Sequence, residues 1–156
     1  MLPVLIYGAV TERETRFLVR VCEEKGIAYC VEPDLPETPA VRLQHQAHHF
    51  TSAIAAGVYL DALVAENPLV PDQPDQLGAM WEILLSKAGS AEEMERTLAA
   101  SPYLAGEALT LADLFWQGHW QCFAEESPAI RDWLARLSLS PGAKVLAKLE
   151  ATHKAG

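Results

Sequence analysis

Residues 2–35 read LPVLIYGAVTERETRFLVRVCEEKGIAYCVEPDL, and this stretch decides the fold. The apolar run of residues 2–7 is typical of a strand buried on both faces. Apolar side chains then recur at helical spacing over residues 11–25, and Gly26 follows as a stop signal. A second β-prone run covers residues 27–35. The stretch therefore predicts a β-α-β unit with parallel strands and a right-handed crossover.

Prolines divide the rest of the chain. Residues 33–40 hold three prolines and no apolar periodicity, which predicts a loop. Residues 41–66 show a helical pattern, and the proline-rich segment 67–76 predicts a linker. Five further helical segments follow, at residues 77–87, 91–100, 111–125, 129–137 and 142–152. We therefore expect an α/β part over residues 1–66 and an all-helical bundle over residues 77–156.

Composition and charge exclude several classes of function. The 156 residues are 50% hydrophobic, which is enough for a sizeable core. The 12 Lys and Arg residues against 21 Asp and Glu residues give a formal net charge of −9, which repels polyanions, so we expect no nucleic-acid partner. A single arginine or a helix N-terminus can still bind a small anion.

The distribution of apolar residues and of cysteines favours a cytoplasmic location. Charges and prolines break every apolar segment, and the N-terminal run lacks the basic region of a secretory signal, so we expect no membrane partner. Cys22, Cys30 and Cys122 have spacings that fit neither a disulfide framework nor a zinc site. Reduced thiols and a cytoplasmic location are the prediction.

Several stretches of the chain resemble glutathione transferases. Residues 5–35 are similar to the opening of many such proteins, where a strand ending in Tyr-Gly leads into a helix closed by Glu-Glu-Lys-Gly-Ile. Further agreement follows in the expected order at Val58-Tyr59-Leu60-Asp61, Tyr103-Leu104-Ala105-Gly106, Leu109-Thr110-Leu111-Ala112-Asp113, and Ser127-Pro128 with Trp133, Arg136 and Pro141. The resemblance to the glutathione S-transferase superfamily implies a shortened thioredoxin-like part followed by a helical domain of transferase type.

The most specific of these matches is Thr110-x-x-Asp113, which resembles the family's capping box. A threonine at the N-cap accepts a hydrogen bond from a backbone N–H of the first turn, while the aspartate reaches back to the cap. Such a cap contributes about 1 kcal/mol to stability. It therefore predicts a helix start after Thr110 and carries no catalytic meaning.

The chain departs from the family where glutathione is activated. In the family a Ser, Cys or Tyr near the first helix favours the glutathione thiolate. The ungapped alignment places Glu12 at the Ser/Cys position and Arg13 at the proline that follows. A carboxylate at this place opposes a thiolate by like charge. Thr11 and Tyr7 are the nearby hydroxyls that can substitute, and they are the candidate catalytic residues; Glu12 and Arg13 are candidates for ligand binding.

A second departure concerns the γ-glutamyl end of glutathione. The family has a helix, a strand after a cis-proline and a further strand before a Glu/Gln-Ser pair. Only residues 36–51 separate Leu35 from Ser52, and we expect this to be too short for those elements. Aligned from Tyr59, the pair falls on Ser52 and the alanine after it. Glutathione is the one cofactor that the resemblance suggests, and we expect its affinity to be weak or absent.

Two local clusters stand out beyond the resemblance. His45, His48 and His49 lie in the segment predicted as helical, where His45 and His49 would share a face. Two such ligands do not make a metal site, so we interpret the cluster as a solvated or pH-sensitive surface, with metal binding and a ligand contact as the alternatives.

The other cluster is aromatic and lies in the segment 111–125. Trp116, His119 and Trp120 lie near the place where family members build a pocket for hydrophobic substrates. Aromatic side chains at helical spacing usually fill a bundle interior, so core packing is the simpler interpretation. A small hydrophobic ligand is the alternative.

Two functions follow from these observations. The first is a degenerate transferase-like protein that acts as a binding or assembly module, as a homodimer or with a protein partner. The second is a glutathione-dependent transferase or ligand carrier that acts on a small hydrophobic electrophile, with Thr11 or Tyr7 positioning the thiol. The strand edge left by the expected deletion favours self-association.

Overall fold

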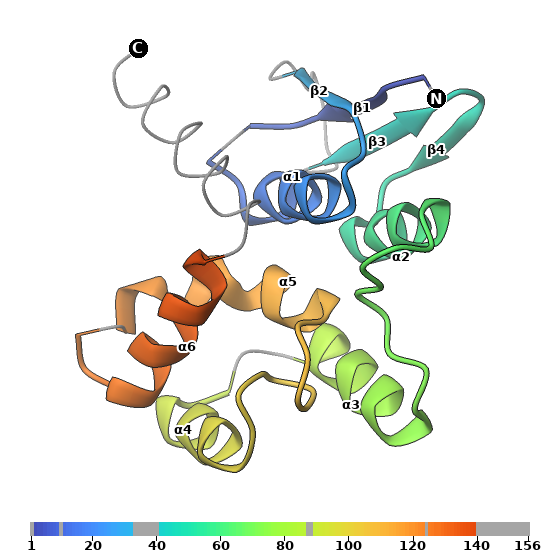
Figure 1. Ribbon diagram of the computed structural model, residues 1–156. Helices are drawn as coiled ribbons and strands as arrows, with labels where there is room; N and C mark the ends of the chain where they lie inside the picture. The colour runs from blue at the N-terminus through green and yellow to red at the C-terminus, as the bar shows by residue number, and fades with distance from the viewer. Residues whose placement is uncertain (1, 10, 33–40, 87–88, 124, 140–156) are drawn as a thin grey trace. The chain divides into compact units, whose positions relative to one another are not determined.

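The computed structural model of the chain describes residues 2–9, 11–32, 41–86, 89–123 and 125–139. These residues belong to two compact units, one that runs to Asn67 and one that spans Pro68–Leu139. The first unit holds the β-sheet and the second is helical (Figure 1).

The predicted β-α-β unit is confirmed. Strand β1 (Val4–Tyr7) is followed by helix α1 (Arg13–Lys25) and strand β2 (Tyr29–Glu32), which pairs with β1 in parallel. Gly26 ends α1 in the left-handed conformation with φ 68°, and its N–H bonds to carbonyls of the last turn. Glycine adopts this conformation without steric cost, so the stop signal acts as the sequence predicts.

The predicted helix over residues 41–66 is wrong in its first part. This segment forms strand β3 (Arg42–His45), strand β4 (His48–Phe50) and only then helix α2 (Ala53–Leu63). The two strands pair antiparallel through a two-residue turn at Gln46 and Ala47. Gln46 has a φ of 57°, a value that glycine or asparagine usually supplies in such a turn. The turn therefore lacks its ordinary sequence signal.

The first unit has one mixed sheet with the strand order β2-β1-β3-β4. The expectation that residues 36–51 are too short for two further strands is wrong, because β3 and β4 lie within them. The predicted loop over residues 33–40 lies outside the described residues. Among the described residues no helix lies between β2 and β3. The predicted fold class is confirmed: a small thioredoxin-like α/β part and a set of helices.

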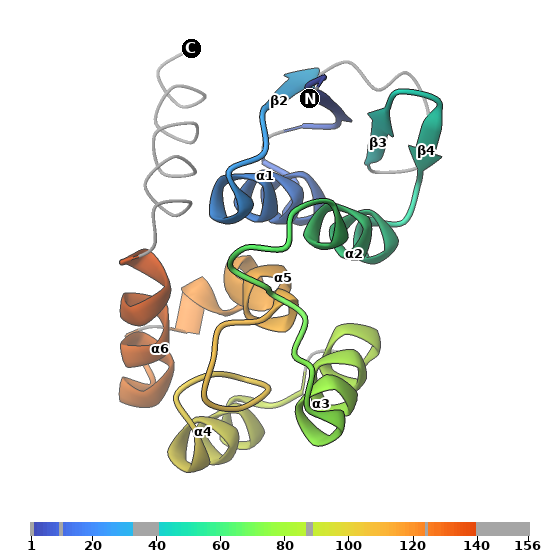
Figure 2. The ribbon, with the colours of Figure 1, turned by 45° about the vertical axis from the view of Figure 1, so that its right-hand side comes forward.

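Both helices of this unit cover one face of the sheet (Figures 1 and 2). Ile6 and Leu43, which are paired neighbours on β1 and β3, are fully buried on that face. Phe17 of α1 packs against Gly57 of α2, where a Cβ would lie 2.6 Å from the phenyl Cζ. The glycine thus allows α1 and α2 to approach closely.

A buried ion pair ties the two helices of this unit together. The Nζ atom of Lys25 lies 3.0 Å from a carboxylate oxygen of Asp61, at the end of α2. The same ammonium donates to the backbone carbonyls of Glu66, at 2.8 Å, and Asn67, at 3.3 Å. Because the lysine side chain is fully buried, these partners replace the water that its charge would otherwise bind.

The second unit contains helices α3 (Pro74–Leu85), α4 (Ala91–Ala100), α5 (Leu111–Trp120) and α6 (Pro128–Ser138), with a 3₁₀ turn η1 (Gln121–Phe123) after α5. These four helices confirm the corresponding sequence predictions. Helix α3 begins inside the predicted linker, because Pro74 takes the first-turn position that suits proline. The predicted segment 142–152 lies outside the described residues.

The capping box is confirmed at the start of α5. The hydroxyl of Thr110 accepts a hydrogen bond from Ala112 N at 3.2 Å, and a carboxylate oxygen of Asp113 accepts one from Thr110 N at 3.0 Å. The other carboxylate oxygen accepts from Leu104 N at 3.0 Å and from the indole nitrogen of Trp133 at 2.8 Å. Asp113 thus joins α5 to the preceding loop and to α6.

No helix within the described ranges combines the length and the apolar character needed to cross a membrane.

Candidate functional site

One end of the sheet brings most of the predicted site residues together. Tyr7, at the end of β1, pairs with Arg42 at the start of β3, and Leu43 pairs with Phe50 at the end of β4. The segments that leave β1 and β4 here lead directly into α1 and α2. We call this end of the sheet, with the first turns of both helices, the helix-start end.

Thr11 and Glu12 lie at the start of α1. Glu12 is the N-cap residue, with an extended backbone and no hydrogen bond from its side chain to the first turn. Thr11 precedes it, and both residues are exposed. The structure therefore places a carboxylate where the helix dipole would otherwise favour an added anion.

Arg13, the residue after Glu12, forms an ion pair with the next carboxylate along the chain. Its guanidinium lies 3.1 Å from the carboxylate of Glu14, which is also in the first turn of α1. The start of α1 therefore carries two carboxylates, Glu12 at the N-cap and Glu14 in the first turn, and Arg13 pairs with Glu14. The carboxylate of Glu12 at the N-cap disfavours a thiolate at this place by like charge.

Tyr7 lies at the same end of the sheet but on the other face. Neighbouring residues of a strand point to opposite faces, and Ile6 is buried on the face that α1 and α2 cover. The Tyr7 ring instead stacks with the guanidinium of Arg42, which lies 4.6 Å from the ring centroid. Thr11 is therefore the candidate hydroxyl that adjoins the α1 start, whereas Tyr7 stacks on Arg42.

Ser52 marks the start of α2. It is the N-cap residue, and its hydroxyl accepts a hydrogen bond from Ala55 N at 3.2 Å. Sequence reasoning placed this residue inside a longer helix, because the hairpin before it was not foreseen. Ser52 is exposed and has no acidic residue in the helical turn that follows it. This helix start therefore differs in charge from that of α1.

The histidine cluster lies on the hairpin and not on a helix, so the predicted shared face is wrong. His45 is buried, and its Nδ1 atom lies 2.7 Å from the hydroxyl of Tyr59 on α2. The rings of His48 and Phe50 also contact Tyr59, whereas His49 points to the opposite face, as its place between these residues requires. Within the described ranges no three His, Cys, Asp or Glu side chains gather as metal ligands would.

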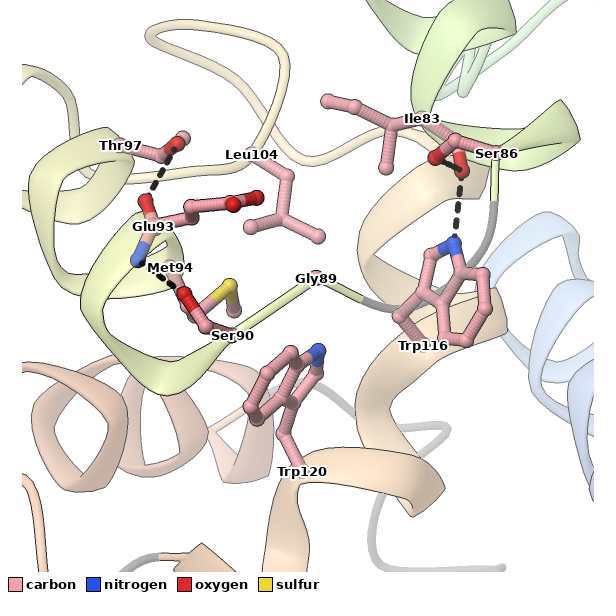
Figure 3. A pocket seen from close by; sticks show the side chains of 10 residues that line it. All are labelled: Ile83, Ser86, Gly89, Ser90, Glu93, Met94, Thr97, Leu104, Trp116 and Trp120. Carbon is pink, nitrogen blue, oxygen red and sulfur yellow. Dashed lines mark hydrogen bonds between the residues drawn. The ribbon is translucent and has the colours of Figure 1, made fainter.

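The second unit contains a cavity of about 230 Å³ (Figure 3). It is bordered by the end of α3, one side of α4, the loop before α5, and α5 itself. The lining residues are Ile83, Ser86, Gly89, Ser90, Glu93, Met94, Thr97, Leu104, Trp116 and Trp120. All of them belong to the helical unit.

Of the three aromatic candidates, two line this cavity. Trp116 and Trp120 are 7% and 4% exposed, and the indole nitrogen of Trp116 donates to Ile83 O at 2.8 Å. His119 is exposed and does not line the cavity, although its ring packs edge-on against both tryptophans. The two tryptophans thus serve both the core and the cavity wall.

Sequence reasoning missed the α4 side of the cavity. Ser90 and Glu93 form an S-x-x-E pattern, which predicts a helix start, and Ser90 Oγ does accept a hydrogen bond from Glu93 N at 3.2 Å. That pattern predicts where α4 begins, but it does not predict which other helices pack against α4. The cavity depends on how α3, α4 and α5 pack, for which the local sequence carries no signal.

No family model and no curated protein sequence matches the chain. Solved structures do match, among them glutathione transferase F2 from Populus trichocarpa, with a TM-score of 0.79 and 12% identity over 96% of this chain and 100% of that one. The apo theta-class glutathione S-transferase of Xanthomonas axonopodis pv. citri gives a TM-score of 0.78 and 20% identity, over 94% of this chain and 97% of that one.

A glutathione S-transferase-I structure bound with lactoylglutathione has a TM-score of 0.78 and 18% identity, over 95% of this chain and 100% of that one. Identities at this level establish similarity of fold and not of activity. Since the similarity extends over both the α/β unit and the helical unit, this chain has the fold of the glutathione S-transferases.

Proposed function

We propose that this protein is a degenerate transferase-fold protein that binds a ligand or partner and does not conjugate glutathione. The observation that carries the proposal is Glu12 at the N-cap of α1, exposed and without a capping hydrogen bond. The alignment with the family puts the residue that activates the thiol at this position. A carboxylate here raises the cost of a neighbouring thiolate instead of lowering it.

The surroundings of Glu12 support the proposal. Arg13 pairs with Glu14, and Arg42 stacks on the ring of Tyr7. These two arginines of the helix-start end therefore already have partners. A glutathione thiolate at the start of α1 would have to form beside the carboxylate of Glu12.

A second candidate function is a glutathione-dependent transferase or carrier for a small hydrophobic electrophile. It is favoured by Ser52, which caps α2 at the same end of the sheet and leaves a helix start without acidic residues. Such a helix start can bind the γ-glutamyl carboxylate of glutathione. A theta-class relative in fold has been solved with glutathione bound.

Binding of glutathione separates the two candidates. We propose calorimetric titration of the whole protein with reduced glutathione, with Ser52→Ala as the variant and Ser138→Ala, on an exposed part of α6, as the matched control. The binding-module proposal predicts no saturable heat at millimolar glutathione in any of the three proteins. Saturable binding that is lost in Ser52→Ala and kept in Ser138→Ala would favour the transferase instead.

A further inference from the structure

The cavity of the helical unit has the size of a site for a one-ring or two-ring ligand. An apolar cavity of about 150 Å³ takes up benzene, and this one measures about 230 Å³. Its walls include two indoles together with Met94 and Leu104, which are both buried. Flat apolar walls of this kind favour a flat apolar ligand.

One wall carries a hydrogen-bond donor without a protein acceptor. The indole nitrogen of Trp116 is satisfied by Ile83 O, but that of Trp120 has no acceptor among the described residues. Figure 3 shows the Trp120 nitrogen on the side of its ring that faces Gly89 and Trp116. Trp120 lines the cavity, so an acceptor atom on a bound ligand would pair with this N–H.

The opposite wall carries a carboxylate. Glu93 is exposed, and its side chain lies directly over Gly89, where an added Cβ would collide with Oε2. Its carboxylate has no ion-pair partner among the described residues. The hydroxyls of Ser90 and Thr97, on the same helix, are engaged with the backbone of α4 and do not neutralise it.

The flat apolar walls, the indole N–H of Trp120 and the carboxylate of Glu93 together point to one class of ligand. A carboxylate beside two indole faces favours a cation, because aromatic faces attract positive charge. The net charge of −9 raises the local concentration of cations further. We propose that the cavity binds a small arylalkylamine in its ammonium form, with its ring between Trp116 and Trp120, its ammonium group at Glu93, and a hydroxyl oxygen on the ring accepting from the Trp120 indole.

This inference rests on the proposed function in so far as that function is to bind a ligand, and it adds the chemical class of the ligand. It does not involve the helix-start end of the sheet, so the two proposals fail separately. Conjugation of glutathione would overturn the proposed function whether or not an amine binds. Failure of amine binding would overturn only the inference about the cavity.

Three matched probes test the assignment by calorimetric titration of the whole protein. Tyramine carries a phenol and an ammonium group, 4-ethylphenol lacks the charge, and 3-(4-hydroxyphenyl)propionate replaces it with a carboxylate. We expect tyramine to bind at least tenfold more tightly than 4-ethylphenol, and the propionate to show no saturable binding. Equal affinities for the three probes, or no binding of tyramine at millimolar concentration, would overturn the proposal.

Two variants locate the site. Glu93→Gln should weaken tyramine binding at least tenfold and leave 4-ethylphenol unchanged, whereas Glu92→Gln, at the neighbouring exposed position outside the cavity, should change neither. Trp120→Phe keeps an aromatic wall but removes the N–H. It should weaken the binding of tyramine and of 4-ethylphenol severalfold. Thermal melting of each variant verifies folding. An identical tyramine affinity in Glu93→Gln and Glu92→Gln would contradict the assignment.

Discussion

The indole nitrogen of Trp133 on α6 donates a hydrogen bond of 2.8 Å to the carboxylate of Asp113 on α5. Both residues are fully buried. Burial raises the pKa of Asp113, and the hydrogen bonds from Leu104, Trp133 and Thr110 act in the opposite direction. The capping box thus serves both as a local helix start and as a connection between two helices.

The cap gives the first prediction. Thr110→Ala removes the hydroxyl that accepts from Ala112 N, and we expect the free energy of unfolding to fall by about 0.5–2 kcal/mol. Thr110→Ser keeps a hydroxyl and should retain most of the stability. Denaturant midpoints measure the difference. Coincident midpoints for wild type and Thr110→Ala would count against the energetic role of the cap.

The close approach of α1 and α2 gives the second prediction. Gly57→Ala would put a Cβ within 2.6 Å of the Phe17 ring, and we expect a loss of about 1–3 kcal/mol through overpacking. Gly78→Ala in α3 is the control, because its Cβ would meet no atom within 4 Å. That change should be neutral or stabilising, since alanine is the better helix former. Equal effects of the two substitutions on thermal unfolding would refute the packing argument.

The thiols give the third prediction. Burial, with a smaller contribution from the charge of Glu23, raises the pKa of Cys22 to about 12, while Cys30 is exposed. Iodoacetamide at pH 8 should modify Cys30 in the native protein and reach Cys22 only after denaturation, because the thiolate is the reactive form. Peptide mass spectrometry reads the result. Equal rates of modification in the native state would show that Cys22 is accessible.

The raised pKa of Cys22 also predicts that the stability of the protein depends on pH. The folded state holds the Cys22 proton above the ordinary pKa of 9.0, while the unfolded state releases it. This contribution to stability is therefore complete below pH 9 and is lost as the pH rises towards 12, by at most about 1.4 kcal/mol per pH unit. Denaturant titrations across this range should show a shallower decline for Cys22→Ala. Identical slopes for the two proteins would contradict the prediction.

Self-association is the fifth prediction. Among the described residues β2 and β4 are the edge strands of the sheet, and each leaves a row of backbone groups for pairing. We expect a homodimer at micromolar concentration, and light scattering after gel filtration should give twice the mass of one chain. A single-chain mass over the whole concentration range would remove the support for an assembly role.

Local patterns were sufficient to predict the β-α-β unit and four of the helices. Arg13–Lys25 has both an apolar face and a glycine stop, and α5 has its capping box, so each carries its own start or end signal. The hairpin of β3 and β4 was missed although Val41, Leu43 and His45 alternate as buried positions. Its turn places Gln46 at positive φ, and no glycine or asparagine marks it.

The candidate site was predictable only where it lies close to a helix start. Thr11, Glu12 and Ser52 were found through the resemblance to the family, whose site residues align with positions that here precede α1 and α2. The exposure of Glu93 and the unpaired indole of Trp120 depend on the packing of three helices. No spacing in the sequence reports that geometry, so the cavity as a whole could not be predicted.

The absence of glutathione conjugation is the central claim, and the turnover of 1-chloro-2,4-dinitrobenzene with reduced glutathione measures it directly. We predict no enzymatic rate for the wild type. Glu12→Ser, which replaces the N-cap carboxylate of α1 with a hydroxyl, should raise any trace activity, and Glu107→Ser, an exposed control, should not. Wild-type turnover that saturates at millimolar glutathione and survives both Thr11→Ala and Tyr7→Phe would contradict the account.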